Sequence, residues 1–345
     1  MNCTFIIPTF NRTEHLQRQL RYCSKAFRDF TICVADGSDA EKASMNRATV
    51  EQSGHPHASY YHFPDTHLWQ RAVFLLDSIS TPYAMLYADD DFAMPSGVHE
   101  SLHFLDSHPE YATAQGITIG LPGPSLGGSV GWHLNSLVGK ISADCPVERA
   151  AQHLAGYSHT IYSVHRTSVL HAGLRIAGSP PFSMQTVCLG ELAQSLHSLV
   201  SGKAAWLDVP FLCRSPSLSS WPAALEMTHP DFSKCIETMR NLVSPAAHPS
   251  DKASITQARQ LFNHAFTQYF LRGRFSLESP EFDFWNWCSS RASCLKKPDL
   301  HEVVNKLKSG EGWSELVAEY PEAATTKLKQ SRFKSWFRSA FPPCP

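Results

Sequence analysis

The feature of this sequence that most restricts its fold is an apolar run that ends abruptly in three aspartates. Residues 83–92 read YAMLYADDDF, with Asp89, Asp90 and Asp91 directly after the run. The run has the length of a buried strand, whereas three adjacent carboxylates repel each other and resist burial unless a cation compensates them. Mg²⁺ and Mn²⁺ take such oxygen ligands beside substrate phosphates, and open α/β sheets bind ligands beyond the carboxyl ends of their strands. The stretch therefore predicts either a site for a metal-bound nucleotide or a solvated acidic turn.

The rest of the N-terminal half alternates between strand and helix patterns. A helix is predicted from Asn11, which forms a capping-box-like pair with Glu14, and further helices over residues 66–79 and from Ser96. Apolar runs predict strands at residues 3–8, 30–35, 83–88, 111–119 and 204–213. This rhythm is typical of an α/β fold with a parallel sheet. Residues 120–131, rich in Gly, Pro and Ser, predict a long loop.

Composition argues against several classes of protein. The 345 residues carry a net charge of -1, so no basic field indicates a nucleic-acid partner. No two of the ten cysteines have CxxC spacing, which argues against a zinc ribbon and favours free thiols in a reducing cytosol. No apolar stretch is long enough to span a bilayer, and no basic leader precedes the first strand. We therefore expect a cytoplasmic protein.

Four segments line up along this pattern. They are IIPTFNR at residues 6–12, VADGSD at 34–39, YADDDF at 87–92, and GELAQSLHSLVSGKAAWLDVP at 190–210. Their order and spacing resemble the nucleotide-sugar glycosyltransferases of the GT-A fold, most closely the inverting family-two type. The resemblance covers residues 1–215 and implies a Rossmann-like, mostly parallel sheet flanked by helices. A helical C-terminal region is predicted at residues 216–324, with candidate helices at 232–242 and 255–270, and a basic aromatic tail at residues 325–345.

The resemblance assigns the first two segments to the nucleotide. In that family the turn after the first strand packs against the base, and here the turn comprises Pro8, Thr9, Phe10 and Asn11, with Arg12 next. An aspartate at the end of the second strand hydrogen-bonds the base or ribose, and Asp36 matches it, although turn aspartates are also common for structural reasons. Arg71 and His67 are candidate contacts to the diphosphate.

The acidic triplet (Asp89, Asp90 and Asp91) resembles the DxD motif of the family, which binds the ribose and a Mn²⁺ or Mg²⁺ ion on the diphosphate. With the downstream Pro95 as a register mark, Asp89 would face the ribose and Asp90 the metal. A strict DxD pattern selects Asp89 and Asp91 instead. Both registers stay open, so all three aspartates belong to the expected site.

Glu191 falls where the family has the acidic residue that activates the acceptor hydroxyl, but Leu192 replaces the usual second acid. The resemblance implies that Glu191 is a general base and that one displacement inverts the anomeric configuration. A glutamate in the first turn of a helix is also simply a favourable partner of the helix dipole, and without this base a retaining mechanism stays open. His165 and Arg166 resemble the basic pair common before this segment.

The predicted reaction moves a sugar from a UDP- or GDP-linked donor to a glycan or glycolipid hydroxyl, as in bacterial-type surface-glycan synthesis. Trp132, Tyr157 and Trp206 are candidates for stacking on acceptor sugars or for the core. One alternative is a nucleotidyltransferase, although its glycine-rich loop after the first strand is missing from PTFNR. Another is a non-catalytic nucleotide-sugar-binding protein of the same fold, which the missing second acid favours.

The last stretch, residues 325–345, differs in kind from the rest. Its charged side chains are all basic: Lys327, Lys329, Arg332, Lys334 and Arg338. Aromatic side chains interleave with them. Such a stretch predicts either an interfacial helix on an anionic membrane or a terminal helix that packs on the protein through its aromatic rings.

Overall fold

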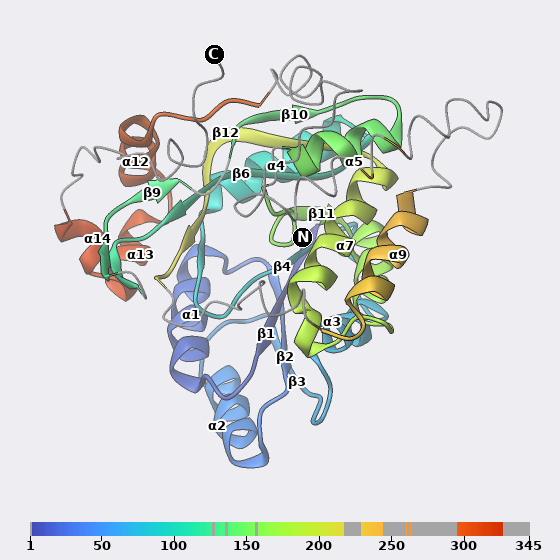
Figure 1. The fold of residues 1–345 in the computed structure, drawn as a ribbon. Helices are drawn as coiled ribbons and strands as arrows, with labels where there is room; N and C mark the ends of the chain where they lie inside the picture. The colour runs from blue at the N-terminus through green and yellow to red at the C-terminus, as the bar shows by residue number, and fades with distance from the viewer. Residues whose placement is uncertain are drawn as a thin grey trace.

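The computed structural model describes residues 2–125, 128–134, 137–155, 158–216, 229–243, 260, 263 and 295–326. These residues form a central sheet with helices against its two faces (Figure 1). The sheet has ten strands, eight of which lie in the order β10-β12-β6-β11-β4-β1-β2-β3. The mostly parallel α/β architecture expected from the sequence is therefore confirmed.

The long strands of this sheet run in one direction. The eight ordered strands are β1 (Cys3–Thr9), β2 (Thr31–Asp36), β3 (Ala58–His62), β4 (Tyr83–Leu86), β6 (Tyr111–Gly120), β10 (Gly139–Ile141), β11 (Val164–Arg166) and β12 (Lys203–Arg214), while β5 (Phe92–Ala93) pairs with β12 and β9 (His133–Leu134) with β6. The pairs β1–β2, β1–β4, β2–β3 and β6–β12 are parallel. Because β11 is antiparallel to both β4 and β6, the carboxyl ends of β1, β4 and β12 lie at the same edge.

Helices cover both faces and form separate cores with them. They are α1 (Thr13–Ala26), α2 (Ala40–Glu51), α3 (Leu68–Leu76), α4 (Pro95–Ser107), α5 (Pro146–Ala155), α6 (Thr167–Ala177), α7 (Val187–Ser201), α9 (Phe232–Val243), α12 (Leu300–Ser309), α13 (Trp313–Glu319) and α14 (Glu322–Thr325). Phe5 and Ile7 of β1 pack in the cluster that contains α1, whereas Ile6 packs with α3 and α6. Burial on both faces explains why the strands appear in the sequence as continuous apolar runs.

Several boundaries differ from the sequence expectations. The predicted start of α1 at Asn11 is wrong, because the helix begins at Thr13 and its N-cap Arg12 makes no capping bond. Asn11 has φ +56°, and its side-chain amide donates to Asp39 at 3.0 Å instead of capping the helix. The predicted loop at residues 120–131 contains a short hairpin, β7 (Gly123–Ser125) and β8 (Gly128–Val130). The unpredicted elements β3 and α2 lie at the far edge of the sheet, where alternate strand residues are exposed.

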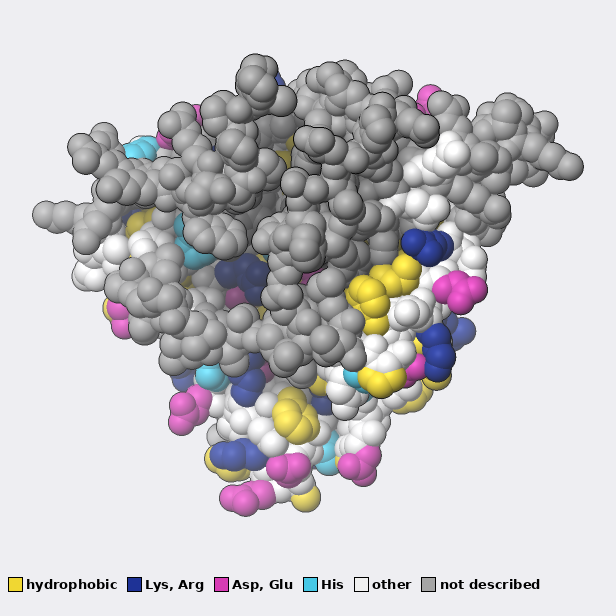
Figure 2. All heavy atoms as spheres, viewed as in Figure 1, with side chains coloured by type: hydrophobic (Ala, Val, Ile, Leu, Met, Phe, Trp, Pro, Cys, Tyr) yellow, Lys and Arg dark blue, Asp and Glu magenta, His cyan; other side chains and the backbone are white. Residues whose placement is uncertain are grey.

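Helices beyond residue 229 pack onto this α/β unit. α9 joins a cluster with α5 and α7, while α12, α13 and α14 contribute Val304, Leu316 and Ala323 to the core of β1. The described surface carries mixed charge, with basic side chains beside acidic ones (Figure 2). Among the described helices, none is both long and apolar enough to cross a bilayer. The helix expected at residues 255–270 lies almost wholly outside the described residues, and so do residues 327–345 of the tail. Both therefore stay predictions. The division of the chain into three regions also stays a prediction.

Helix α4 approaches β12 so closely that only a glycine fits at the contact. A Cβ atom added to Gly97 would lie 2.6 Å from the Cα atom of Phe211 and closer still to the carbonyl oxygen of Pro210. Both atoms belong to the strand backbone, so they cannot move without shifting β12. The position of β12 matters because its last residue, Arg214, reaches the edge where the strands end.

We expect Gly97→Ala to lower the Tm by about 2 °C or more. Overpacking against backbone should cost up to about 3 kcal/mol, which outweighs the roughly 1 kcal/mol that alanine gains over glycine inside a helix. Thermal unfolding followed by circular dichroism measures the change. Gly131→Ala is the control, because Gly131 is exposed and an added Cβ meets no atom within 4 Å. An unchanged Tm for Gly97→Ala would mean that α4 can move away from β12 without cost.

Candidate functional site

The candidate site lies where the carboxyl ends of β1, β4 and β12 meet. The turn after β1 supplies Arg12, the acidic triplet follows β4, and β12 ends at Arg214. All three strands point the same way, so their ends bring these charged side chains together at one edge of the sheet. This is the edge at which the sequence predicts a ligand site.

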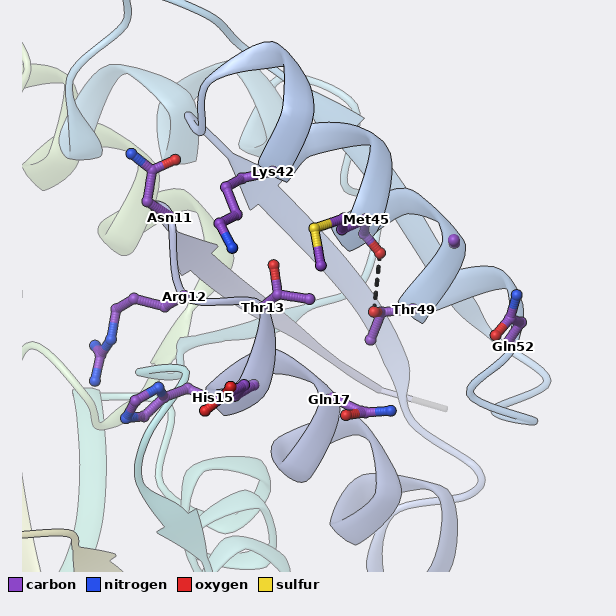
Figure 3. Close-up of a pocket in the computed structure, with 11 residues that line it drawn as sticks. Asn11, Arg12, Thr13, His15, Gln17, Lys42, Met45, Thr49 and Gln52 are labelled. Carbon is purple, nitrogen blue, oxygen red and sulfur yellow. Dashed lines mark hydrogen bonds between the residues drawn. The ribbon is translucent and has the colours of Figure 1, made fainter.

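The turn after β1 is held rigidly by the neighbouring turn after β2. The backbone N–H of Asn11 donates to Oγ of Ser38 at 2.7 Å, and the backbone N–H of Asp39 donates to the Asn11 side chain at 3.1 Å. Beside this turn, a groove of about 590 Å³ opens between α1 and α2 (Figure 3). Lys42 points into the groove, whereas the side chain of Arg12 points away from it. The turn therefore directs Arg12 toward the acidic triplet.

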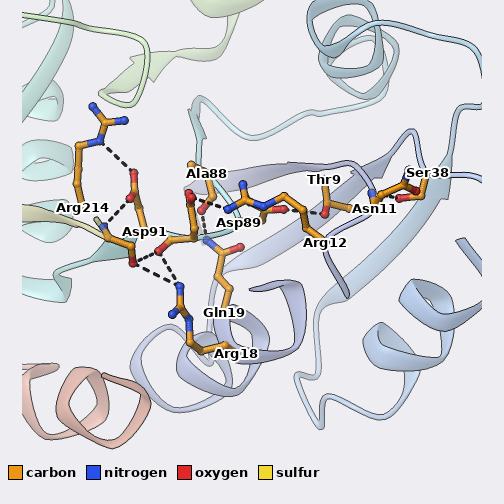
Figure 4. Close-up of polar contacts among 12 residues, drawn as sticks. Thr9, Asn11, Arg12, Arg18, Gln19, Ser38, Ala88, Asp89, Asp91 and Arg214 are labelled. Atoms are coloured by element: carbon orange, nitrogen blue, oxygen red, sulfur yellow. Dashed lines mark hydrogen bonds and ion pairs between the residues drawn. The ribbon is translucent and has the colours of Figure 1, made fainter. Parts of the chain in front are cut away.

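Arg12 bridges Asp89 and Asp90, and Figure 4 shows its guanidinium beside Asp89. Its Nη1 atom lies 2.7 Å from Oδ1 of Asp89, and its Nη2 atom lies 2.6 Å from Oδ2 of Asp90. Thr9 donates a hydrogen bond of 2.7 Å to the other oxygen of Asp89. Burial alone would lower the pKa of Arg12, but the charges of Asp89 and Asp90 outweigh it and raise the pKa. The guanidinium therefore stays charged and holds the turn after β1 against the end of β4.

The third aspartate is held from the opposite side of the triplet. The backbone N–H of Ser215 donates to Oδ1 of Asp91 at 3.0 Å, and Nε of Arg214 lies 3.5 Å from its Oδ2. Oγ of Ser215 and the guanidinium of Arg18 both donate to the carbonyl oxygen of Asp90. These contacts fasten the end of β12 and the first half of α1 to the acidic triplet.

Burial raises the pKa of two of the aspartates. The side chains of Asp89 and Asp91 are each only 3% exposed. Burial raises the pKa of Asp89 to about 6 although Arg12 opposes it, and raises the pKa of Asp91 to about 7 although Arg214 opposes it. The neighbouring carboxylates add to both shifts, because like charges disfavour ionisation. A bound cation would therefore stabilise the charged form of this cluster.

The donor set fits a hard divalent cation that is shared with a ligand. Oδ2 of Asp91 is buried and makes no hydrogen bond, and Asp90 is the most accessible member of the triplet, with 19% of its side chain exposed. Within the described residues, no three His, Cys, Asp or Glu side chains are arranged to hold an ion by themselves. Mg²⁺ is commonly bound by one or two carboxylates together with substrate phosphates, which is the arrangement that this triplet can offer.

Glu191, which lies on α7, interacts electrostatically with Arg214, the arginine that pairs with Asp91. It is half-buried in the second turn of α7, which begins at Val187. The dipole of a helix acts mainly on its first turn, so it does not account for this glutamate. Burial alone would lower the pKa of Arg214, but Asp91 and Glu191 are among the groups that outweigh it and raise the pKa. Arg214 therefore interacts with the acidic triplet and with Glu191 at the same time.

Asp36 is fully buried and its carboxylate is occupied by the protein itself. One oxygen accepts from the backbone N–H of Ser38 at 2.7 Å, and the other accepts from Asn46 and from the hydroxyl of Tyr60, both at 2.8 Å. A contact between Asp36 and a base or ribose would require these bonds to rearrange. In this structure Asp36 organises the turn after β2.

Phe10, in the turn after β1, has a solvent-exposed aromatic ring, with 55% of the residue exposed.

Arg71 reaches the site from α3 and is 4% exposed. Its guanidinium occupies the space directly over Gly37, where any side chain at that position would collide with it. Burial lowers the pKa of Arg71, and the charges of Asp36 and Asp89 offset part of that effect. Its Nε atom is buried and makes no hydrogen bond. A buried, incompletely paired guanidinium is suited to bind an anion such as a diphosphate.

Other predicted residues have structural roles. His67 caps α3 by accepting from the backbone N–H of Trp69, and His165 bonds to Ser163 and Gln194. Arg166 donates to three backbone carbonyls, those of residues 105, 108 and 111. Trp132 and Trp206 are 5% and 3% exposed and belong to the core, so neither offers a face for an acceptor sugar. Tyr157 lies outside the described residues.

The sequence patterns do not single out two arginines that are central to the site. Arg18 lies one turn and a half after the start of α1 and contacts the backbone of Asp90, while its guanidinium lies 5.1 Å from the ring centre of Phe92. Arg214 ends a strand at the same edge as the acidic triplet. β12 and β4 are not neighbours in the sheet, and the pairing of β5, directly after the triplet, with the end of β12 brings Arg214 to Asp91; no sequence pattern signals this contact.

Comparison with known proteins identifies the fold. No family model matches the sequence, and no curated protein matches it. Among solved structures, S. aureus TarS 1-349 in complex with UDP-GlcNAc matches with a TM-score of 0.59 and 11% identity over 89% of this chain and 81% of that one. The same protein in complex with UDP gives a TM-score of 0.51 and 12% identity over 93% and 81% of the two chains.

The chain has the fold of nucleotide-sugar glycosyltransferases. A further TarS 1-349 structure matches with a TM-score of 0.54 and 11% identity, over 89% of this chain and 80% of that one. The GT-A fold expected from the four sequence segments is thus confirmed. At these identities the likeness concerns the fold alone, and the chemistry rests on the residues of the site.

The raised pKa of Asp91 predicts how its removal affects stability. A carboxyl whose folded-state pKa lies above its unfolded value stabilises the fold below about pH 4, and this contribution is lost as the pH rises through about 7. Asp91→Asn imitates the neutral form. We therefore expect this substitution to raise the Tm of the ligand-free protein by about 2 °C or more at pH 8 and to change it less at pH 5.

Differential scanning fluorimetry at the two pH values measures this effect. Asp29→Asn is the matched control, because Asp29 is exposed and its neutralisation should leave the Tm nearly unchanged at both pH values. A lower Tm for Asp91→Asn at pH 8 would contradict the prediction and would mean that the ion pair with Arg214 outweighs the cost of burial.

Proposed function

We propose that this chain is a nucleotide-sugar glycosyltransferase that uses a Mn²⁺ or Mg²⁺ ion and inverts the anomeric configuration. The observation that carries the proposal is the convergence of cations, the acidic triplet and Glu191 at the carboxyl edge of a sheet with this fold. A diphosphate leaving group requires cations, and an acceptor hydroxyl requires a base. The solved neighbours that hold UDP-GlcNAc or UDP favour a uridine nucleotide over GDP.

The donor would be held by groups from several strand ends. The exposed ring of Phe10 would pack against the base, and the buried guanidinium of Arg71 would contact the diphosphate. Asp90, together with Asp89 or Asp91, would hold the ion. When bound, the ion acts as a Lewis acid that neutralises the charge of the leaving diphosphate. Pro8 and Thr9 would support this surface through their positions at the end of β1.

Glu191 would accept the proton of the acceptor hydroxyl while the hydroxyl oxygen forms its bond to the anomeric carbon. The bond between that carbon and the diphosphate oxygen breaks in the same step, and its electron pair leaves with the nucleoside diphosphate. A single displacement of this kind inverts the anomeric configuration. Arg214 interacts both with Glu191 and with Asp91, so it would link this base to the acidic triplet.

The acceptor would be a hydroxyl of a glycan or glycolipid, as in bacterial-type surface-glycan synthesis. We place the reaction in the cytoplasm, and the basic residues of the stretch 325–345 support contact with an anionic membrane surface, where a lipid-linked acceptor would be found. The separation of these charges by aromatic residues is the sequence pattern that supports this arrangement.

The test of the proposal is release of nucleoside diphosphate from a panel of UDP- and GDP-linked sugars. We expect slow hydrolysis of one UDP-linked sugar even without an acceptor, because water can replace the acceptor hydroxyl. The rate should require Mn²⁺ or Mg²⁺ and vanish in EDTA, since the acidic triplet cannot approach a diphosphate without a cation. Release that persists unchanged in EDTA would remove the metal from the proposal, and no release and no binding of any donor would overturn it.

Glu191→Gln should lower turnover by about 10²-fold or more, the scale of a lost general base, while leaving the Kd of the donor nearly unchanged. Steady-state kinetics and calorimetric titration with the donor separate the two effects. Glu51→Gln is the control, because Glu51 is exposed and ends α2. Equal turnover of wild type and Glu191→Gln would leave the inverting mechanism without its base.

A further inference from the structure

The ion pairs of Arg12 use carboxylate oxygens of Asp89 and Asp90 that a divalent cation between these two residues would need. Its two terminal nitrogens contact one oxygen of Asp89 and one oxygen of Asp90, at 2.7 and 2.6 Å. The second oxygen of Asp89 accepts from Thr9. Both oxygens of Asp89 are therefore engaged, and an ion that enters between Asp89 and Asp90 must compete with the charge-assisted contacts of Arg12, which are among the stronger kinds of hydrogen bond.

We infer that Arg12 is an internal counter-cation that competes with the divalent ion for Asp89 and Asp90, so that the ion binds well only when a diphosphate is present. This inference rests on the proposed function, because it assumes that the acidic triplet takes a metal-bound nucleotide. It assigns Arg12 a role that differs from contact with the base. The guanidinium compensates part of the charge of Asp89 and Asp90 until the donor arrives.

In this structure the backbone before Arg12 is fixed by hydrogen bonds, whereas the side chain of Arg12 is partly exposed and can change its conformation. Its backbone is fixed, because the preceding residue Asn11 is bonded to Ser38 and Asp39. Its side chain is 39% exposed, whereas that of Asp89 is 3% exposed. The guanidinium can therefore rotate away from the aspartates into the open part of the site without any change in the fold.

A diphosphate supplies the partner that a displaced Arg12 needs. Guanidinium groups bind phosphate through two parallel N–H···O bonds, and the two terminal nitrogens that Arg12 now directs at Asp89 and Asp90 could form such a pair. When the diphosphate and the ion enter together, Arg12 exchanges carboxylate oxygens for phosphate oxygens, and the ion takes its place on the aspartates. When the ion enters alone, Arg12 loses its partners. The affinities for ion and nucleotide are thereby coupled, and the coupling is reciprocal.

The test measures Mn²⁺ binding to the full-length protein, by electron paramagnetic resonance of free Mn²⁺, with and without UDP. For Arg12→Gln we expect Mn²⁺ alone to bind at least about tenfold more tightly than to wild type, and the enhancement by UDP to shrink by a similar factor. The affinity of UDP should fall in the same variant. These opposite changes distinguish competition from a general loss of the site.

Two further variants test whether Arg12 weakens Mn²⁺ binding by occupying carboxylate oxygens of Asp89 and Asp90 or only by adding positive charge near them. Arg18→Gln removes a nearby positive charge from α1. Arg18 contacts the backbone carbonyl of Asp90, the hydroxyl of Ser215 and the ring of Phe92, but no carboxylate of the acidic triplet, so no carboxylate oxygen is freed and the affinity for Mn²⁺ should change much less. Arg12→Lys keeps the charge but replaces the planar fork by a single ammonium group, so its affinity for Mn²⁺ should lie between those of wild type and Arg12→Gln.

The inference is overturned if Mn²⁺ binds to Arg12→Gln as to wild type or more weakly, while wild type still binds Mn²⁺ with UDP. In that case the proposed metal-nucleotide site stands without the competition. It is also overturned if Arg18→Gln gains as much affinity as Arg12→Gln, because the effect is then one of charge alone. If no variant binds Mn²⁺ even with UDP, the metal of the proposed function fails together with the inference. Arg12→Lys supplies the comparison if Arg12→Gln unfolds.

Discussion

Compensation of three adjacent carboxylates by arginines is the interaction on which the site depends. Asp89, Asp90 and Asp91 follow the buried strand β4. Repulsion among their carboxylates would destabilise the segment after this strand if no cations were present. Arg12 comes from the turn after β1 and Arg214 from the end of β12. The ion pairs therefore join segments from both ends of the α/β unit, and they fix the relative positions of the groups that a donor and an acceptor would meet.

The compensation is incomplete, and this has consequences for function. Burial raises the pKa of Asp89 to about 6 and that of Asp91 to about 7 despite the neighbouring arginines. Arg71, in turn, is buried with an unpaired Nε atom. The ligand-free site thus contains buried charges of both signs that are not fully paired. Binding of a metal-bound diphosphate would pair these charges and so contribute favourably to the binding free energy. Such under-compensation is common at sites built for ligands rather than for stability.

Much of the fold was predictable, because burial leaves a direct mark on sequence. β1, β2, β4, β6 and β12 appear as apolar runs since both faces of the sheet are covered. β3 escapes prediction because it is an edge strand with alternating exposed residues. The start of α1 was misplaced because Asn11, a residue suited to cap a helix, bonds to the neighbouring turn instead. At this position the tertiary contact between Asn11 and Asp39 outweighs the tendency of asparagine to cap a helix.

The sequence by itself determined which chemistry is available: an acidic triplet at a strand end, a glutamate near the start of an apolar helix, and the order of segments typical of the fold. Only the tertiary structure decided how these groups are paired. Arg12 and Asp89 are 77 positions apart, and Ser215 and Asp91 are 124 apart. No local pattern encodes such contacts, because they depend on which strands become neighbours. The same reason explains why the sequence did not reveal that Asp36, which the resemblance assigns to the base or ribose, accepts hydrogen bonds from Asn46 and Tyr60.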